Sequence, residues 1–274
     1  MFFKDRRRKK LASQPFPPQW LVIVEKNVPL YARLPASDQE ELRRNILIFL
    51  GEKKFEGCGG LRMTDEIKVT IAAHACMLLL HRRTDYYPGL KSILVYPRAY
   101  VADRAHHLLG GMVLEGPDIR QGESWHHGSV VLSWDDVRRS AADIHDGQNV
   151  VFHEFAHQLD STHGRGDSTP VLRNLSTFIA WARTLGEDYE KFRRDIREKG
   201  AEVLDEYGAV DPAEFFAVAT EGFFEQPREL QRVYPRLYDE LKRFYQQDPA
   251  TFDQPDEDRS SKGRSTEPSK PKNS

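Results

Sequence analysis

The pentapeptide from His153 to His157, HEFAH, combines residue types that bind metal ions and transfer protons. Pro and Gly are absent between Gln148 and Asp160, and the flanking residues are apolar, so the sequence predicts a helix. Histidines four residues apart share one helical face, with Cβ atoms about 5–6 Å apart, so both can reach one metal ion. Glu154 points to one side of that face and can act on a water without binding the metal. The pattern is typical of a zinc hydrolase, with His153 and His157 as ligands and Glu154 as base.

The alternative interpretation is a helix with two ordinary histidines and no metal. An ionised Glu154 without a partner would be costly inside such an apolar helix. A further ligand candidate also follows downstream in the sequence. Both observations favour the metal site.

Two residues compete for the third ligand position that a catalytic zinc requires. His163 follows His157 at metzincin spacing, but Asp160 replaces the metzincin glycine and all four methionines precede the motif, which excludes a Met-turn. Glu214 opens the apolar segment 212–225, where a lone carboxylate needs a cation or a hydrogen-bond donor. A glutamate there can also simply complement the helix dipole. We favour Glu214.

Three other residues have both a functional and an ordinary interpretation. Tyr207 can donate to the oxyanion of a tetrahedral intermediate, or it can pack at a turn. Glu221 lies two helical turns after Glu214 and can orient a ligand histidine, or it can be a solvated charge. Asp160 shares the face of the two histidines and can accept the other ring N–H of one of them, or it can be a helix-end residue.

Composition limits the class of protein. The 274 residues carry a formal net charge of −2, which argues against nucleic acid as a direct partner. Cys58 and Cys76 form no CxxC pair, which disfavours a disulfide framework and fits the cytoplasm. No apolar stretch is long enough to span a membrane, and the basic run Lys4–Lys10 excludes a secretory signal. We interpret that run as a solvated, flexible end rather than a contact for acidic lipid or RNA.

The chain is predicted to be one large unit between two disordered tails. The basic tail covers residues 1–15 and the polar tail 251–274, and the unit at 16–250 divides into a helical part (about 16–90) and a catalytic part (about 91–250). Periodicity and turn signals predict helices near 20–28, 37–50, 64–82, 134–144, 148–160, 170–199 with a break at Gly186, 212–225 and 228–247, and strands near 92–96, 111–115 and 129–133 with a loop over 116–128. We therefore expect an α+β fold, mostly helical, with a small sheet before the HEFAH helix.

A known family carries the same paired motifs. The stretch from His153 to Asp160, HEFAHQLD, together with YGAVDPAEFFAV from Tyr207, resembles the Mlc titration factor A family of bacterial zinc metallopeptidases. Further similar segments, including residues 55–61, 93–97, 131–134 and 244–249, extend the resemblance over roughly residues 16–250. The arrangement of Tyr207 and Glu214 is also similar to the catalytic domain of anthrax lethal factor. Lethal factor has a carboxylate four residues after its glutamate ligand, whereas this chain has Val218.

The resemblance implies a zincin-like fold of the gluzincin type, with one Zn²⁺ per chain on His153, His157 and Glu214, Glu154 as base and Tyr207 as oxyanion donor. It also implies a cytoplasmic peptidase that acts on peptide or protein substrates and is aminopeptidase-like on small ones. Family members in enteric bacteria bind the repressor Mlc and so affect sugar uptake. The alternative function is a non-catalytic protein that sequesters a transcription factor.

Overall fold

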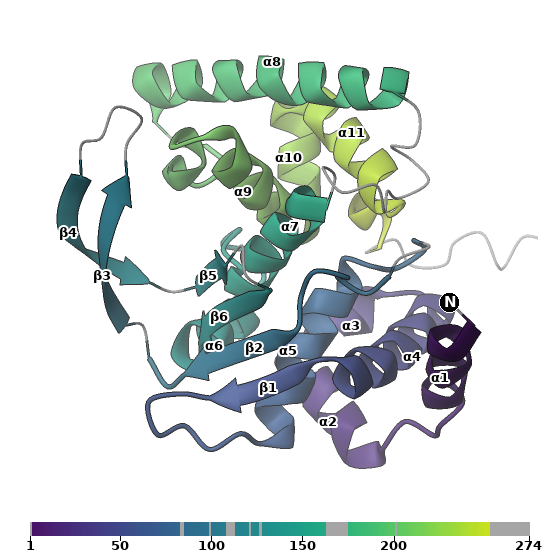
Figure 1. Cartoon of the computed structure of the whole chain (residues 1–274). Coiled ribbons are helices and arrows are strands. Elements are labelled where there is room, and N and C mark those ends of the chain that lie inside the picture. The colour runs from purple at the N-terminus through teal and green to yellow at the C-terminus, as the bar shows by residue number, and fades with distance from the viewer. Residues whose placement is uncertain are drawn as a thin grey trace, which may run out of the picture.

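The computed structural model describes residues 2–82, 85–98, 100–107, 113–120, 122–125, 128–162, 175–200 and 202–252. Helices dominate, and a small sheet lies between an N-terminal and a C-terminal group of helices (Figure 1). The mostly helical α+β fold expected from the sequence is confirmed. Among the helices within these ranges, none has the length and apolarity needed to cross a membrane.

The main sheet has four strands in the order β1 (Lys54–Gly57), β2 (Ser92–Tyr96), β6 (Ser129–Ser133) and β5 (Gly122–Trp125). The first three strands are parallel, with Phe55 opposite Ile93 and Ile93 opposite Val130. β5 pairs antiparallel to β6 at the end of this order. Alternate residues of β2 are buried, as expected for a strand covered on one face.

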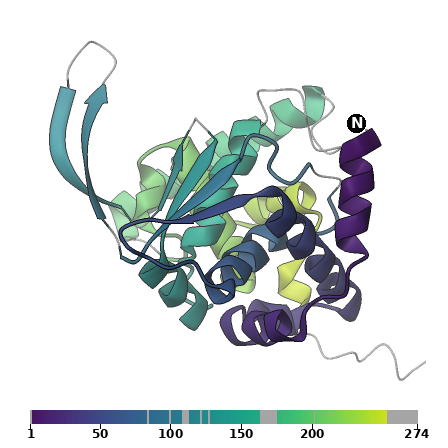
Figure 2. The ribbon, with the colours of Figure 1, turned by 60° about the horizontal axis from the view of Figure 1, so that its bottom comes forward.

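A separate two-stranded ribbon, β3 (Tyr100–His107) and β4 (Val113–Arg120), stands away from the body of the molecule (Figures 1 and 2). The loop expected over residues 116–128 is therefore wrong, because β4 runs to Arg120 and β5 follows at once. Gly116 and Pro117 suggested a turn, but Pro117 is tolerated here because each strand of a two-stranded ribbon is an edge strand.

The N-terminal helices are α1 (Phe2–Ala12), α2 (Pro18–Asn27), α3 (Leu30–Arg33), α4 (Ala36–Glu52) and α5 (Asp65–Met77). The side chain of Thr64 accepts a hydrogen bond from the Ile67 amide and so caps α5. Residues 2–12 form α1 instead of the disordered tail expected over residues 1–15, because Arg8 forms ion pairs with Glu52 and Asp85. The other proposed boundaries, 16–250 and 251–274, stay predictions, and residues 253–274 lie outside the described ranges.

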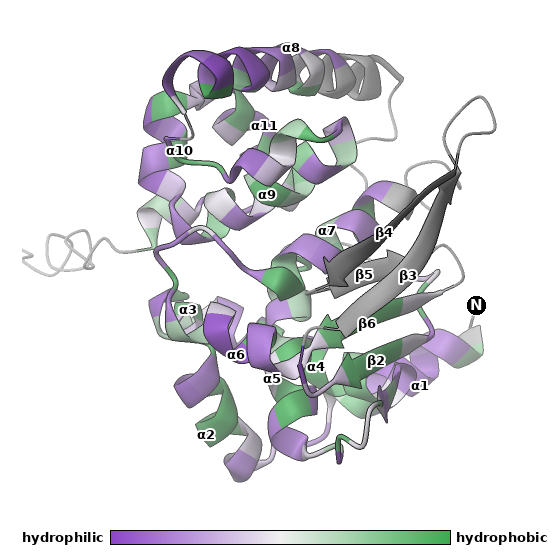
Figure 3. Ribbon diagram, turned by 90° about the vertical axis from the view of Figure 1, so that its left-hand side faces the viewer, coloured by the Kyte–Doolittle hydropathy of each residue, from purple (hydrophilic) through white to green (hydrophobic). Residues whose placement is uncertain are grey.

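The C-terminal helices are α8 (Leu175–Lys199), α9 (Pro212–Glu225), α10 (Pro227–Val233) and α11 (Pro235–Tyr245), with the 3₁₀ turns η2 (Glu206–Ala209) and η3 (Pro249–Thr251). The coloured part of α8 is largely hydrophilic in Figure 3, whereas α9 is buried along residues 215–225. The helix expected over 228–247 is divided at Pro235, which cannot donate a helical hydrogen bond. The break expected at Gly186 is absent, because an interior glycine costs a helix only about 1 kcal/mol.

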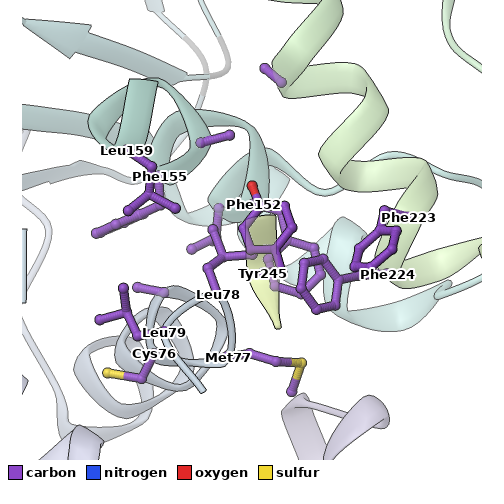
Figure 4. Close-up of a cluster of buried hydrophobic side chains, with 14 of the residues drawn as sticks. Cys76, Met77, Leu78, Leu79, Phe152, Phe155, Leu159, Phe223, Phe224 and Tyr245 are labelled. Atoms are coloured by element: carbon purple, nitrogen blue, oxygen red, sulfur yellow. The ribbon is translucent and has the colours of Figure 1, made fainter. Parts of the chain in front are cut away.

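Helix α7 (Val150–Thr162) is the centre of the fold and carries the HEFAH pentapeptide. It follows α6 (Trp134–Ala142) and contacts α5, α9, β5 and β6. Phe152 and Phe155 are fully buried in the hydrophobic cluster that also contains Leu78, Phe224 and Tyr245 (Figure 4). The ring of Phe152 contacts Phe224 of α9, and the ring of Phe155 contacts Tyr87 and Phe49 of α4. Fixing this face in the core leaves the opposite face of α7 to present His153 and His157.

Candidate metal centre

Asn149 caps the start of α7. Its side-chain oxygen accepts the amide of Phe152 at 3.0 Å, which is a standard N-cap bond. Its own carbonyl accepts the amide of His153 at 2.9 Å. Ser140 contributes a second bond, because its hydroxyl accepts the amide of Val150 at 3.1 Å. The start of α7 is therefore fixed one turn before the first histidine.

Three donor atoms converge beside α7. The Nε2 atoms of His153 and His157 lie 3.2 Å apart, and Oε2 of Glu214 lies 2.9 Å from the first and 3.3 Å from the second. Each side chain is about one-sixth exposed, so the cluster lies at the surface of the core rather than within it. Within the described ranges, these three residues form the one group of His, Cys, Asp and Glu side chains that could hold a metal ion.

The donor set fits a metal ion. Ligands at about 2.0–2.2 Å from a tetrahedral zinc stand about 3.3–3.6 Å apart, close to the separations observed here. The hydrogen bond from Nδ1 of His153 leaves its Nε2 as a lone pair in the neutral ring. The carboxylate oxygen of Glu214 and this Nε2 are then two acceptor atoms only 2.9 Å apart, which a proton or a cation must bridge. A metal ion resolves that conflict.

The pKa values of His153 and Glu214 also indicate that the cluster favours a positive charge. Burial alone would lower the pKa of His153, but hydrogen bonds to Glu214 and Glu221 raise it well above its usual value. Burial acts to raise the pKa of Glu214, yet hydrogen bonds from His153 and His157 bring it down to about 2. A proton on His153 thus supplies, in the metal-free protein, the positive charge that the carboxylates require.

The buried residues Glu221 and Asn149 fix the Nδ1 side of the His153 ring through hydrogen bonds. Nδ1 of His153 donates to Oε1 of Glu221 at 2.8 Å, and the backbone amide of Asn149 donates to the other oxygen of Glu221. The side chain of Asn149 also donates to Glu225 at 2.9 Å. One asparagine therefore caps α7 and ties it to two glutamates of α9, so that the two helices are held in register.

Glu214 reaches the cluster from the first turn of α9. Asp211 caps this helix, and its side chain accepts the amides of Ala213 at 2.8 Å and Glu214 at 3.0 Å. Pro212 occupies the first turn, where a missing N–H does no harm. The cap fixes the backbone of Glu214 directly, so the position of the third donor depends on Asp211.

Tyr207 approaches the same cluster from η2. Its ring centroid lies 5.9 Å from that of His153, and its side chain is 53% exposed. Asp205 accepts the amide of Tyr207 at 2.8 Å and the side-chain amide of Gln148 at 3.0 Å. The turn that carries Tyr207 is therefore tied to the segment before α7. A 53% exposed aromatic ring beside a metal cluster is accessible to a substrate.

Other expectations meet different outcomes. Glu154 is buried, with 4% exposure, in the turn between the two histidines. Glu221 accepts a hydrogen bond from His153, and Val218 packs near Gly208 of η2. Asp160 lies at an exposed position of α7, while the Nδ1 of His153 is held by Glu221. His163 lies outside the described residues.

Sequence reasoning missed four supporting residues: Asn149, Glu225, Asp205 and Gln148. An asparagine directly before the HEFAH helix is an N-cap signal that was available. Nothing in the local sequence indicates that its side chain reaches Glu225 on α9, because that contact exists only in the folded chain.

Comparison with known proteins gives the same assignment over most of the chain. A family model described as Glucose-regulated metallo-peptidase M90 matches residues 2–246. The chain is 38% identical over 242 residues to the protein slr2042 of Synechocystis sp., covering 88% of each chain. It is 34% identical over 231 residues to Mlc titration factor A of Serratia proteamaculans, covering 81% of this chain and 85% of that protein.

The same name belongs to a Klebsiella pneumoniae relative that is 33% identical over 224 residues, 81% of this chain and 84% of its own length. The matched region contains both the HEFAH helix and the segment with Tyr207 and Glu214. The match to the family model therefore includes the His153–His157–Glu214 cluster that the fold assembles. The chain belongs to the glucose-regulated metallopeptidase family M90, which includes its Mlc titration factor A relatives.

Proposed function

We propose that this chain is a zinc-dependent peptidase that binds one Zn²⁺ through His153, His157 and Glu214. The observation that carries the proposal is the convergence of two imidazole nitrogens and one carboxylate oxygen within 4.8 Å of one another. Two histidines and one glutamate leave a fourth position free, as a catalytic zinc site does. A buried glutamate between the ligand histidines adds a base that a purely structural site would not need.

A bound Zn²⁺ polarises the scissile carbonyl and lowers the pKa of water at the site. Glu154 takes the proton of the attacking water and then delivers it to the leaving amine. The hydroxyl of Tyr207 donates to the carbonyl oxygen as negative charge develops on it. Glu221 keeps the ring of His153 in one orientation during these steps.

We further propose aminopeptidase-like action on small peptides in the cytoplasm. The specificity rests on the resemblance to the Mlc titration factor A family and not on a residue that binds the substrate amine. The compartment is supported by two free thiols, Cys58 and Cys76. A panel of peptide substrates with free and blocked amino termini tests the specificity. Equal cleavage of both kinds would contradict the aminopeptidase assignment.

Glu154→Gln tests the mechanism. The amide keeps the shape of the side chain but cannot accept a proton, so we expect turnover to fall by about 10²–10⁴-fold with the zinc retained. Peptidase activity and metal content are measured on the same preparation, and Glu190→Gln on the surface of α8 is the control. Full activity in Glu154→Gln would remove this residue from the mechanism.

Elemental analysis tests the ligand set. We expect one zinc per chain in the wild type, loss of zinc in Glu214→Ala, and unchanged zinc in His163→Ala. His145→Ala is the control for histidine removal, because His145 is exposed and bonds to Arg33. Loss of zinc in His163→Ala with retention in Glu214→Ala would favour the metzincin arrangement instead.

A second candidate function follows from the name that several relatives carry. Mlc titration factor A denotes a protein that titrates Mlc, so this chain is a candidate for binding a transcriptional repressor. The test is capture of the repressor from cells by the wild type and by Glu154→Gln. Equal capture by both proteins, with turnover lost in Glu154→Gln, would show that binding does not need catalysis. If neither protein captures the repressor, the chain does not bind it.

A further inference from the structure

Helix α1 is fixed to the molecule by one face. Arg8 donates to Glu52 at 2.7 Å and to Asp85 at 2.5 Å, and Lys4 pairs with Asp85 at 2.7 Å. Arg7 donates to the carbonyl of Gly51 at 2.7 Å. Leu11 packs so closely over Gly51 that a Cβ there would lie 2.7 Å from its methyl group. Positions 4, 7, 8 and 11 form one helical face, so α1 is a rigid part of the fold.

The opposite face is mostly basic, and the acidic residue of α1, Asp5, lies four residues before Lys9. Arg6, Lys9 and Lys10 are exposed, and within the described ranges their side chains take part in no ion pair or hydrogen bond. Phe3 lies three residues before Arg6 on the same side of the helix and is 90% exposed. We call these four residues the basic face of α1. Figures 1 and 2 both show α1 at the margin of the molecule.

We propose that the basic face of α1 binds the surface of a lipid bilayer that contains anionic lipid. Lysine and arginine on one side of a surface helix are attracted to anionic headgroups, and an exposed aromatic side chain can enter the boundary with the acyl chains. Phe3, Arg6 and Lys10 lie within about 60° of one another around the helix and can meet a flat surface together, whereas Lys9 lies about 60° further round, at the edge of this face. The ion pairs of Arg8 already fix α1 to the rest of the protein. Binding to the bilayer therefore does not have to order the helix.

A bilayer suits this face better than a nucleic acid does. Three cations on one convex helix provide neither a groove for a strand nor a contact with several successive phosphates. A 90% exposed phenylalanine gains most by leaving water for an apolar medium. α1 packs on α4, whereas the metal cluster lies on α7 and α9, so this inference is independent of the proposed function.

The test is sedimentation of the full chain with vesicles of pure phosphatidylcholine and with vesicles in which a third of the lipid is phosphatidylglycerol. Each lysine or arginine near an anionic surface strengthens partitioning roughly fivefold. We therefore expect Arg6→Glu/Lys9→Glu/Lys10→Glu to weaken binding to the anionic vesicles by on the order of 100-fold or more. Added salt should weaken wild-type binding, and Phe3→Ser should weaken it further at any salt concentration.

The control is Arg194→Glu/Arg197→Glu/Lys199→Glu at the exposed end of α8, which makes the same change in net charge. The neutral variant Arg6→Gln/Lys9→Gln/Lys10→Gln tests whether misfolding explains the loss of binding. It should also bind less while its circular dichroism spectrum stays native. Equal loss in the α8 control would show a general charge effect and overturn the proposal. So would failure of the wild type to bind anionic vesicles, including the case in which it binds a single-stranded RNA at the same salt concentration.

Discussion

The ring of His153 has a partner at each nitrogen, Glu221 at Nδ1 and Glu214 at Nε2. Glu221 is itself fixed by the amide of Asn149 and is only 6% exposed. Such partners set the tautomer and the orientation of a ligand histidine, and their loss typically costs 10–100-fold in metal affinity, an approximate range. We therefore expect loss of Glu221 to weaken metal binding almost as much as loss of a ligand.

Glu221→Gln tests this support at the scale of one residue. The amide nitrogen of glutamine must face either the Asn149 amide or the Nδ1–H of His153, and both are donors. We expect zinc affinity to fall by about 10–100-fold, measured by competition with a chelator. Glu225→Gln is the matched comparison, because Glu225 bonds to Asn149 without reaching His153. Equal affinities for wild type and Glu221→Gln would return Glu221 to an ordinary buried carboxylate.

Tyr207→Phe removes one hydroxyl and leaves the ring beside His153. Because the phenol is not among the three metal-binding groups, we expect the zinc content to be unchanged. Loss of one oxyanion donor costs about 10²–10³-fold in kcat. Steady-state kinetics on one peptide substrate measure the effect, and KM should change little. A wild-type kcat would mean that Tyr207 only packs at the turn.

At the scale of elements, two aspartate caps position two different functional groups. Asp211 caps α9 at Glu214, whereas Asp205 caps η2 at Tyr207 and holds Gln148. Removing a cap costs about 0.5–2 kcal/mol of stability. The two caps should nevertheless differ in their effect on activity, since one fixes the proposed metal ligand Glu214 and the other the proposed oxyanion donor Tyr207.

Asp205→Ala and Asp211→Ala are expected to separate these roles. Asp211→Ala should weaken zinc binding, because the first turn of α9 loses the bonds that fix Glu214. Asp205→Ala should keep zinc and lower kcat by up to about 100-fold, since a misplacement near 1 Å can cost that much. Gln148→Ala removes the hydrogen bond between Gln148 and Asp205 but leaves the cap that Asp205 makes on η2. Loss of zinc in both aspartate variants would show that η2 and α9 act as one unit.

The sequence predicts α7 and α9 well because each carries its own signals. An apolar run free of Pro and Gly defines α7, and Asp211 with Pro212 marks the start of α9. Local signals fail where distant contacts decide, as in α1, where Lys4 and Arg8 pair with Glu52 and Asp85. Pro235 was a local signal that periodicity alone overlooked.

The residues of the candidate site also fall into those that local sequence predicts and those that it does not. His153, Glu154 and His157 follow from spacing within one helix, and Glu214 follows from its apolar context and the resemblance. Asn149 and Glu225 were not predicted, because their contact joins the start of α7 to the end of α9 across the core. Their importance depends on how the helices pack, which no local pattern encodes.

At the scale of the whole molecule, the polar chain that supports the site also couples folding to pH. Burial raises the pKa of Glu225 to about 9, and the charge of Glu221 acts in the same direction against the bond from Asn149. Glu225 is 1% exposed, so the folded protein holds this carboxyl protonated at neutral pH. An unfolded glutamate has a pKa of about 4.3, so unfolding releases a proton between these two values.

The sign of the pH dependence follows from this difference. A raised folded-state pKa stabilises fully below the unfolded pKa, and that contribution is lost as pH rises toward about 9. We expect the metal-free wild type to lose stability between pH 5 and pH 9, by at most about 1.4 kcal/mol per unit from this group. Glu225→Gln cannot ionise and its amide oxygen can still accept from Asn149, so its stability should fall less steeply. Urea unfolding in the presence of a chelator, at several pH values, measures both slopes, and identical slopes would mean that Glu225 is ionised in the folded protein.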